Sequence, residues 1–275
     1  MDMFSFSKPL KTLVLILMVK SFIAALLILY AGIGLAPDEA QYWTWSQDLS
    51  LGYYSKPPGV AWQIYLGTKL FGDTELGIRF MSVIISACIA LATYFLARKC
   101  SFSSEKASWA GIVIALSPIG ILSSLAATTD GGFILFWILA SAYLVGALRE
   151  ERTLPAVKIG CMIACGALFK WTIYAFIPLV IVFDVCYMHS SKRSFVKLCL
   201  VSLLGMIPSF IWNATHEWAT FKHVLWTNIL GTATKQGASS GNTLEFVAAQ
   251  TGILSPLYFI ILVMAVVYVV RNRKG

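Results

Sequence analysis

The sequence predicts an all-α integral membrane protein with about eight transmembrane helices and short interfacial helices in its first outward loop. Three observations predict this class. Hydrophobic residues make up 58% of the 275 residues, and the mean hydropathy is +0.77. Charged residues make up 12%, where a soluble domain usually carries about a quarter. Apolar runs recur along the chain, and no stretch between them is polar enough to form a soluble domain. Residues 1–275 are therefore predicted to form a single transmembrane domain.

A helix needs roughly 20 mostly apolar residues to span a bilayer. Eight segments approach this length, and they run approximately Thr12–Gly32, Leu76–Ala97, Ala107–Leu125, Gly132–Leu148, Ala156–Phe169, Trp171–Met188, Leu198–Trp212 and Ile253–Val270. The fifth and seventh are short, so they are expected to tilt little or to begin in the interface. Two long outward segments remain, at about residues 35–75 and 213–252.

The first segment has two interpretations. Lys8 and Lys11 before an apolar run are typical of a signal peptide, but no clear small-x-small cleavage site follows. We prefer an uncleaved helix. Lys20 inside it is costly in the bilayer, so we expect it either to extend toward the cytoplasm or to pair within the bundle.

The basic residues predict the orientation. The net charge is +8, and 14 of the 21 Lys and Arg residues lie in alternate loops. Six lie on the opposite side and Lys20 lies within the first span. Loops rich in Lys and Arg face the cytoplasm, so both termini are predicted to be cytoplasmic. Because the basic residues form short clusters between apolar runs, they indicate topology and not a nucleic-acid partner.

The first outward loop holds an acidic pair at a predicted helix start. Pro37 suits the first turn of a helix, which would run to about Leu49, and a second helix is expected at Pro57-Pro58. A transferase that uses a lipid-linked sugar needs a carboxylate to accept a proton and a cation beside the departing phosphate. Asp38 or Glu39 could supply the first and Lys56 the second. The alternative, of comparable weight, is that the acids only stabilise a helix N-terminus and that Lys56 is an interfacial anchor.

Four other polar residues at outward positions each have two interpretations. Asp130 is either the N-cap of the fourth span or a second carboxylate of the same site. Lys170 and Arg79 either contact a lipid phosphate or extend to the interface. His216 is either a metal ligand or a hydrogen-bonding loop residue. The stretch from Trp218 to about Leu230 is predicted to be another interfacial amphipathic segment, and residues 235–242 a flexible one.

Several motifs together resemble a known family. They are Pro-Asp-Glu-Ala-Gln-Tyr-Trp from Pro37, Leu-Gly-Tyr-Tyr-Ser-Lys-Pro-Pro-Gly-Val-Ala-Trp from Leu51, Leu-Phe-Gly-Asp-Thr-Glu-Leu-Gly-Ile-Arg from Leu70, Ala-Thr-Thr-Asp-Gly from Ala127, Phe-Lys-Trp-Thr from Phe169 and Trp-Asn-Ala-Thr-His-Glu-Trp from Trp212. In this order they resemble the bacterial GT-C glycosyltransferases related to dolichyl-phosphate-mannose protein mannosyltransferases, the group that includes the aminoarabinose and galacturonosyl transferases of lipid A and lipopolysaccharide core.

The resemblance implies a GT-C bundle and an inverting transferase in the bacterial inner membrane. Such an enzyme takes a sugar from a polyprenyl phosphate and passes it to an envelope glycolipid, polysaccharide or protein on the outer face. It implies Asp38 as the catalytic or site-organising carboxylate, with Glu39 and Asp130 in support. It implies contacts to the lipid phosphate or the substrates from basic and aromatic residues, namely Lys56, Lys170, Arg79, Tyr54 and His216.

The chain departs from the family pattern in two places. Ser55 stands where many relatives have an acidic residue, and if that acid is a metal ligand in relatives, this chain is expected to lack the metal. A divalent metal is therefore only a candidate cofactor, and no ligands are assigned to it. The chain also ends at Gly275, earlier than the family pattern. This leaves a truncated, non-catalytic remnant or a membrane scaffold as the alternative function. A transporter of lipid-linked sugars is less favoured because, apart from Lys20, the spans are nearly free of polar residues.

Overall fold

The computed structural model describes residues 7–150, 153–226, 245, 249 and 256–271. The elements in this part of the chain are all helical. They are α1 (Lys8–Tyr30), α2 (Pro37–Gln47), α3 (Gly59–Phe71), α4 (Glu75–Lys99), α5 (Ser104–Leu116), α6 (Pro118–Leu125), α7 (Thr129–Arg149), α8 (Ala156–Ala167), the 3₁₀ turn η1 (Trp171–Ala175), α9 (Phe176–Phe183), the π turn η2 (Asp184–Met188), α10 (Lys192–Leu203), the 3₁₀ turn η3 (Leu204–Met206), α11 (Ile207–Thr215), α12 (Ala219–Leu225) and α15 (Pro256–Arg271).

The helix lengths confirm a multi-pass, all-α membrane protein. Five continuous helical segments in the described chain are long and apolar enough to cross a membrane, namely Lys8–Tyr30, Glu75–Lys99, Thr129–Arg149, Trp171–Met188 and Lys192–Thr215. The pair α5–α6 makes a sixth if it counts as one span. Helix α8 has 12 residues, or about 18 Å, which is shorter than a hydrocarbon core of about 30 Å. The apolar part of α15 is Tyr258–Val267, which is also shorter than a full span.

Two predicted spans differ from the structure. The third is not one continuous helix, because α5 and α6 meet at a bend of 60°. Pro118 has no backbone N–H to donate, and the Ser117 hydroxyl accepts a hydrogen bond from the Gly120 amide, which starts a new helix. The seventh begins at Lys192 and not at Leu198, because the Ser191 hydroxyl accepts a hydrogen bond from the Ser194 amide and caps the helix there.

Lys20 pairs within the bundle, as one of the two interpretations predicted. Its ammonium donates to the Ser86 hydroxyl at 2.7 Å and to the Gly120 carbonyl at 2.8 Å. Gly120 lies in the first turn of α6, just after the bend. Lys20 of α1 therefore bonds to a carbonyl beside the break between α5 and α6. The cation thus gains its hydrogen-bond partners within the bundle.

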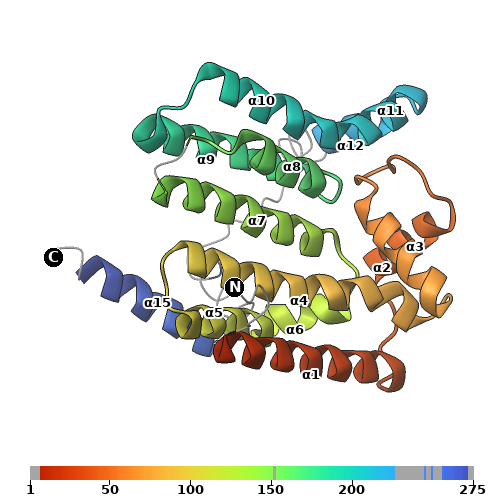
Figure 1. The fold of residues 1–275 in the computed structure, drawn as a ribbon. Helices are drawn as coiled ribbons and strands as arrows, with labels where there is room; N and C mark the ends of the chain where they lie inside the picture. The colour runs from red at the N-terminus through yellow and green to blue at the C-terminus, as the bar shows by residue number, and fades with distance from the viewer. Residues whose placement is uncertain (1–6, 151–152, 227–244, 246–248, 250–255, 272–275) are drawn as a thin grey trace.

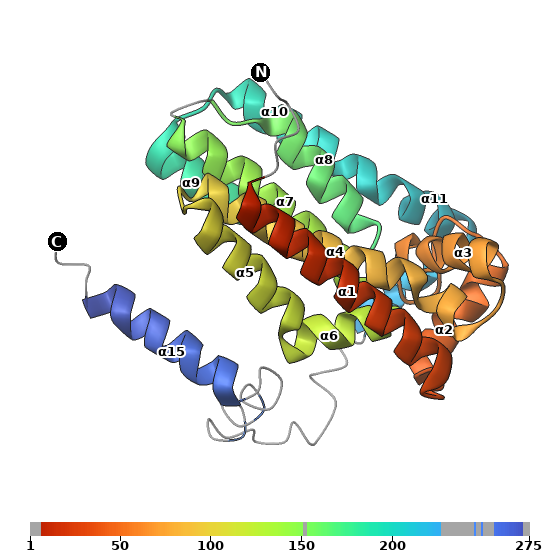
Figure 2. The same ribbon diagram turned by 60° about the horizontal axis from the view of Figure 1, so that its bottom comes forward.

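The long helices lie side by side in the order α1, α4, α7, α8, α10, and α2 and α3 cover one end of this layer (Figure 1). We call this the α2–α3 end. Turned by 60°, the bundle shows α5 and α6 beside α1 (Figure 2). The largest apolar cluster joins α7, α8, α9 and α10 around Ile159, Ile163 and Phe176. A second joins α1, α4 and α5 around Leu13 and Ala90.

The two short helices predicted between the first and second spans are confirmed. Helix α2 begins at Pro37 and ends at Gln47, two residues before the predicted end. Helix α3 begins at Gly59, directly after the double proline. A separate apolar cluster holds them to the bundle, with Tyr42 of α2, Val60 and Ile64 of α3 and Ile78 of α4 as members.

Two glycines allow three chain segments to meet at the α2–α3 end. The Gly59 amide donates to the Leu168 carbonyl at 2.7 Å, which joins the start of α3 to the end of α8. A Cβ at Gly59 would stand 3.1 Å from the Phe169 ring, and a Cβ at Gly132 in α7 would overlap the same ring. Phe169 therefore packs between α3 and α7, and only residues without a side chain fit on either side of it.

We expect Gly132→Ala to destabilise the protein by about 1–3 kcal/mol, because the added methyl group overlaps the Phe169 ring. The measurement is the apparent melting temperature in detergent, which should fall. Gly131→Ala is the matched control. A Cβ there meets a single methyl group, Ile85 Cγ2, at 3.3 Å, so its melting temperature should change little. Equal melting temperatures for the two variants would contradict this account of the packing.

Candidate active site

A buried ion pair lies under the acidic turn of α2. The Glu39 carboxylate and the Arg79 guanidinium of α4 form two hydrogen bonds, Nε to Oε1 at 3.0 Å and Nη2 to Oε2 at 2.8 Å. The side chains are 3% and 1% exposed. The carboxylate also accepts from the Ala36 amide at 3.1 Å and from the Ala127 amide at 2.8 Å. Glu39 thus holds α4, the start of α2 and the segment before α7 together.

The remaining donors of Arg79 are used in the same region. Its Nη1 donates to the Ile33 carbonyl at 2.8 Å, and its Nη2 donates to the Gly34 carbonyl at 2.9 Å. Arg79 was predicted either to contact a lipid phosphate or to extend to the interface. The structure shows neither arrangement, because the guanidinium is buried and its contacts are internal. Burial by itself raises the pKa of Glu39. The hydrogen bonds from Arg79, Ala127 and Ala36, with the arginine charge, outweigh burial and hold that pKa below its ordinary value.

Asp38 points away from this pair. It is exposed, whereas Glu39 is 2% exposed, because adjacent helix positions diverge by about 100°. Tyr42 lies four residues on, on the face of α2 that Asp38 shares. Burial raises the pKa of Tyr42 to about 12, and the charges of Asp38 and Asp130 add to the increase. The two carboxylates come from the first turns of two different helices, α2 and α7.

Asp130 pairs with Lys170 at the same end of the bundle. The Lys170 ammonium lies 2.7 Å from Asp130 Oδ1, and the side chains are 38% and 54% exposed. Helix α7 begins at Thr129 with Thr128 as its N-cap, so the interpretation of Asp130 as the cap residue is wrong. Asp130 occupies the first turn, where the helix dipole favours a negative charge. The pair is accessible to water and to a ligand.

Lys56 and Tyr54 lie in the loop between α2 and α3. The Tyr53 amide donates to the Lys56 carbonyl at 3.1 Å, and the Thr220 hydroxyl donates to the Tyr53 carbonyl at 2.8 Å. Lys56 is half-buried, and its ammonium has no hydrogen bond or ion pair with any residue in the part of the chain that the structure describes. Three residues further on, Gly59 contacts Leu168. Lys56 is thus held near the turn that carries Lys170.

His216 ends α11 and has the hydrogen bonds of a loop residue. Its Nδ1 lies 2.8 Å from the Trp212 carbonyl and 3.0 Å from the Thr215 hydroxyl. A carbonyl only accepts, so Nδ1 carries the proton. The imidazole stacks on the Trp212 indole with a centroid distance of 4.0 Å. Asn213, the first residue of a formal glycosylation sequon, is fully buried, so it is inaccessible to modification.

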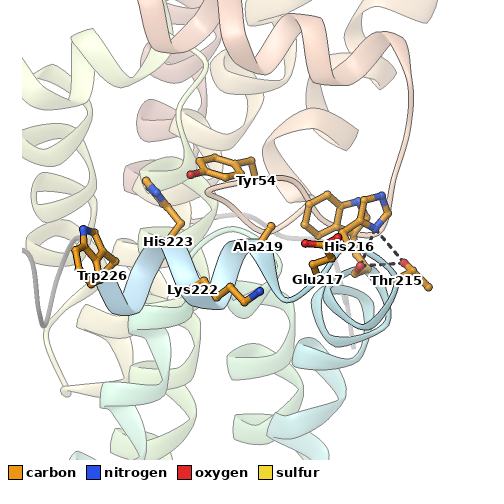
Figure 3. A pocket seen from close by; sticks show the side chains of 9 residues that line it. Tyr54, Thr215, His216, Glu217, Ala219, Lys222, His223 and Trp226 are labelled. Carbon is orange, nitrogen blue, oxygen red and sulfur yellow. Dashed lines mark hydrogen bonds between the residues drawn. The ribbon is translucent and has the colours of Figure 1, made fainter.

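The groove that His216 helps to line has a volume of about 820 Å³. Tyr54 lies on one side of it and α12 on the other (Figure 3). The predicted amphipathic stretch from Trp218 is confirmed only as α12, which ends at Leu225. Its continuation and residues 235–242 lie outside the described residues.

A metal site finds no support in these residues. Across residues 7–150, 153–226 and the described positions beyond them, no three His, Cys, Asp or Glu side chains are grouped to hold a metal ion. His216 and Glu217 are neighbours in sequence, but no third ligand joins them. We therefore derive no chemical step through a metal.

The acids and lysines of this region were predicted from the sequence. Four residues of the site and the groove beside it were not, namely Tyr42, Lys222, His223 and Trp226. Tyr42 lies one helical turn after Asp38, and that spacing was the signal available. Lys222, His223 and Trp226 follow the Trp212–Trp218 motif at helical spacing, but their grouping with Tyr54 depends on tertiary contacts.

The fold and the site define a multi-pass, all-α membrane protein with an acidic and basic cluster at one end of its bundle. The chain belongs to the dolichyl-phosphate-mannose-protein mannosyltransferase family, whose pattern matches residues 55–212, more than half of the chain. It is 29% identical to the lipid A galacturonosyltransferase RgtD of Rhizobium johnstonii over 240 residues, which cover 86% of this chain and 50% of that protein.

It is also similar to the undecaprenyl phosphate-alpha-4-amino-4-deoxy-L-arabinose arabinosyl transferases of Pseudomonas. For Pseudomonas savastanoi pv. phaseolicola the identity is 29% over 187 residues, or 59% of this chain and 34% of the relative. For Pseudomonas aeruginosa it is 29% over 164 residues, or 53% and 29%. The chain thus spans half or less of the length of these relatives. No solved structure matches it.

We expect Glu39→Gln to destabilise the protein by about 3–5 kcal/mol at neutral pH, because it leaves the Arg79 charge buried without a counter-charge. Melting in detergent is the measurement, and Asp38→Asn, an exposed neighbour, is the control and should change stability by about 0.5 kcal/mol or less.

The pH dependence supplies a second readout for the same variant. The folded pKa of Glu39 is lowered, so its stabilising effect is present above its ordinary pKa and is lost as the pH falls through the folded value. The stability difference between wild type and Glu39→Gln should therefore narrow in acid. A difference that grows in acid would contradict the assigned pairing.

Proposed function

We propose that this chain is the membrane part of, or the whole of, a glycosyltransferase that moves a sugar from a polyprenyl-phosphate donor to an envelope glycolipid. The main supporting observation is that exposed Asp38 and the Asp130–Lys170 pair stand at the starts of α2 and α7, which the Glu39–Ala127 hydrogen bond joins. A hydrogen bond between Gly59 and Leu168 joins the loop that carries Lys56 to the turn that carries Lys170. Relatives named for undecaprenyl-phosphate-linked aminoarabinose and for lipid A support the class of donor and acceptor.

Asp38 is the proposed general base. It is the exposed member of the acidic pair, and its backbone is fixed because Glu39 beside it is bonded to α4 and to the Ala127 amide. As the acceptor hydroxyl oxygen forms its bond to the anomeric carbon, Asp38 accepts the hydroxyl proton. The bond from that carbon to the phosphate oxygen breaks, and the electron pair leaves with the lipid phosphate. A single displacement of this kind inverts the anomeric centre.

Lys170 and Lys56 are the proposed phosphate contacts. A departing lipid phosphate gains negative charge on its bridging oxygen, and cations placed beside it stabilise that charge. Lys170 is partly exposed and bonded to a single carboxylate, Asp130, which orients it. Among the described residues the Lys56 ammonium has no partner, so we assign its donors to the phosphate. Tyr54, Arg79 and His216 have other roles in this proposal: Arg79 supports Glu39, and the other two line the groove.

The proposed location is the bacterial inner membrane with the α2–α3 end on the outer face and both termini cytoplasmic. The distribution of Lys and Arg supports this orientation, since the loops at the opposite end of the bundle carry Arg98, Lys99 and Arg149. A polyprenyl donor would keep its tail among the bundle helices and present its phosphate at the level of the interfacial helices α2 and α3.

We expect Asp38→Asn to abolish transfer, a loss of about a hundredfold or more, because the isosteric amide accepts no proton. The measurement is transfer of labelled sugar from undecaprenyl-phosphate-linked donors to lipid A by the purified chain. Asp48→Asn is the matched control, an exposed acid at the far end of α2, and it should keep wild-type activity. Undiminished transfer by the Asp38 variant would contradict its role, and the absence of transfer by the wild type would favour the non-catalytic alternative.

The Asp130–Lys170 pair allows a test that separates binding chemistry from stability. Exposed ion pairs contribute about 0–1 kcal/mol, so Lys170→Ala should change the melting temperature little while transfer falls sharply. The exchanged double variant, Asp130→Lys with Lys170→Asp, should not restore transfer, because the cation would then stand in the wrong place. Restored transfer would make the pair purely structural. Lys99→Ala is the control, since Lys99 and Glu150 form a similarly exposed pair at the other end of the bundle.

A further inference from the structure

The groove of about 820 Å³ beside α12 is not used by the proposed transfer step. Its lining includes Tyr54, Trp212, His216, Lys222, His223 and Trp226. We propose that this groove binds the sugar headgroup of the acceptor, and that the headgroup is a saccharide bearing a phosphate or another anionic group. This inference rests on the proposed function and specifies the acceptor side of the same site.

The ring surfaces of the groove suit a saccharide. The Tyr54 and His223 rings lie 4.8 Å apart, and the His216 imidazole is stacked on Trp212. Trp226 is 63% exposed and follows the last residue of α12, one turn beyond Lys222 and His223 (Figure 3). Pyranose rings have apolar C–H faces and polar edges, and they pack on aromatic side chains that combine an apolar face with a polar group. A purely lipidic ligand would not use this many polar groups.

One cationic side chain of the groove, Lys222, can bind an anion. Lys222 is exposed on the groove face of α12 and forms no hydrogen bond or ion pair within residues 7–150 and 153–226. Two imidazoles, those of His216 and His223, line the groove with it, and Glu217 supplies the one carboxylate. The groove thus holds one permanent cation, Lys222, one carboxylate, Glu217, and two imidazole rings. A phosphate or carboxylate on the sugar would find a charge-assisted donor in Lys222.

The groove adjoins the proposed phosphate site through two contacts. Tyr54 lies two residues before Lys56, in the loop that Thr220 of α12 holds through the Tyr53 carbonyl. On the opposite face of α12, the Phe221 ring stacks at 5.0 Å on Trp171, the residue directly after Lys170. Both proposed phosphate-binding lysines are thus next to residues that position the groove. A headgroup in the groove would lie beside the donor and not in its place.

Asn213 fixes this arrangement from within. Its side chain is fully buried, accepts from the amides of Thr220 and Phe221 at 2.9 and 3.3 Å, and donates to the Thr220 hydroxyl at 3.1 Å. The start of α12 is therefore held by α11, and the groove is a built feature of the fold.

Binding of labelled lipid A to the purified chain in nanodiscs tests the proposal without requiring transfer. The probes are diphosphoryl lipid A and the same lipid after removal of its phosphates. We expect Lys222→Glu and Tyr54→Ala each to weaken binding of diphosphoryl lipid A by about five- to tenfold, the scale of one charge-assisted or stacking contact. Both side chains are exposed, so the variants should fold. On the wild type the dephosphorylated lipid should bind more weakly, and Lys222→Glu should remove that difference.

Lys69→Glu is the matched control, because Lys69 is also an exposed lysine beside a tyrosine ring, 5.0 Å from Tyr65, but lies outside the groove. Its binding should stay within about twofold of the wild type. Unchanged binding by the groove variants, or an equal loss with Lys69→Glu, would overturn the proposal. Asp38→Asn should bind lipid A as the wild type does, so a failure of catalysis and a failure of acceptor binding give different results.

Discussion

The bidentate pair between Glu39 and Arg79 is the interaction on which the α2–α3 end depends. Removing two charges from water costs several kcal/mol for each ion, and the mutual attraction offsets this only when the remaining donors and acceptors are satisfied. Here they are, since the carboxylate accepts two backbone amides and the guanidinium donates to two carbonyls. These backbone groups belong to the linker after α1, the start of α2 and the linker before α7. One ion pair therefore connects α4 to two stretches of chain: the continuous stretch from the linker after α1 into α2, and the linker before α7.

This connection fixes the register of the proposed catalytic groups. Asp38 precedes Glu39, and Asp130 follows Ala127 by three residues, so each exposed carboxylate is joined by a short length of backbone to an atom of the buried pair. The charges of both acids raise the pKa of Tyr42. The two adjacent acids of this helical turn thus have different roles. Buried Glu39 holds the structure together, and exposed Asp38 remains available for the proposed chemistry.

Much of this was predictable from the sequence, and the exceptions have physical causes. Apolar run length located the spans, and Pro37 and the double proline located the starts of the two interfacial helices, because these signals are local. The bend at Pro118 was also a local signal, but the apolar run continues through it and conceals the break. Which of Asp38 and Glu39 is buried is decided by Arg79, 40 residues away, and no local pattern carries that contact. The grouping of Tyr54 with α12 likewise depends on tertiary hydrogen bonds.

The two ion pairs of the site differ in a way that bears on mechanism. The Glu39–Arg79 pair is almost fully buried. If a ligand replaced either partner, the other would remain as an unpaired charge away from water. This pair is therefore suited to holding the structure together and not to binding a ligand. The Asp130–Lys170 pair is 54% and 38% exposed, so its net stabilisation is small and its partners are already hydrated. A phosphate can then take the place of Asp130 at Lys170, or join it, at little energetic cost. The proposed transfer requires the site to bind an anionic lipid and to release it. A cation held in this weak and reversible way suits that requirement, and the buried Glu39–Arg79 pair keeps the surrounding geometry unchanged.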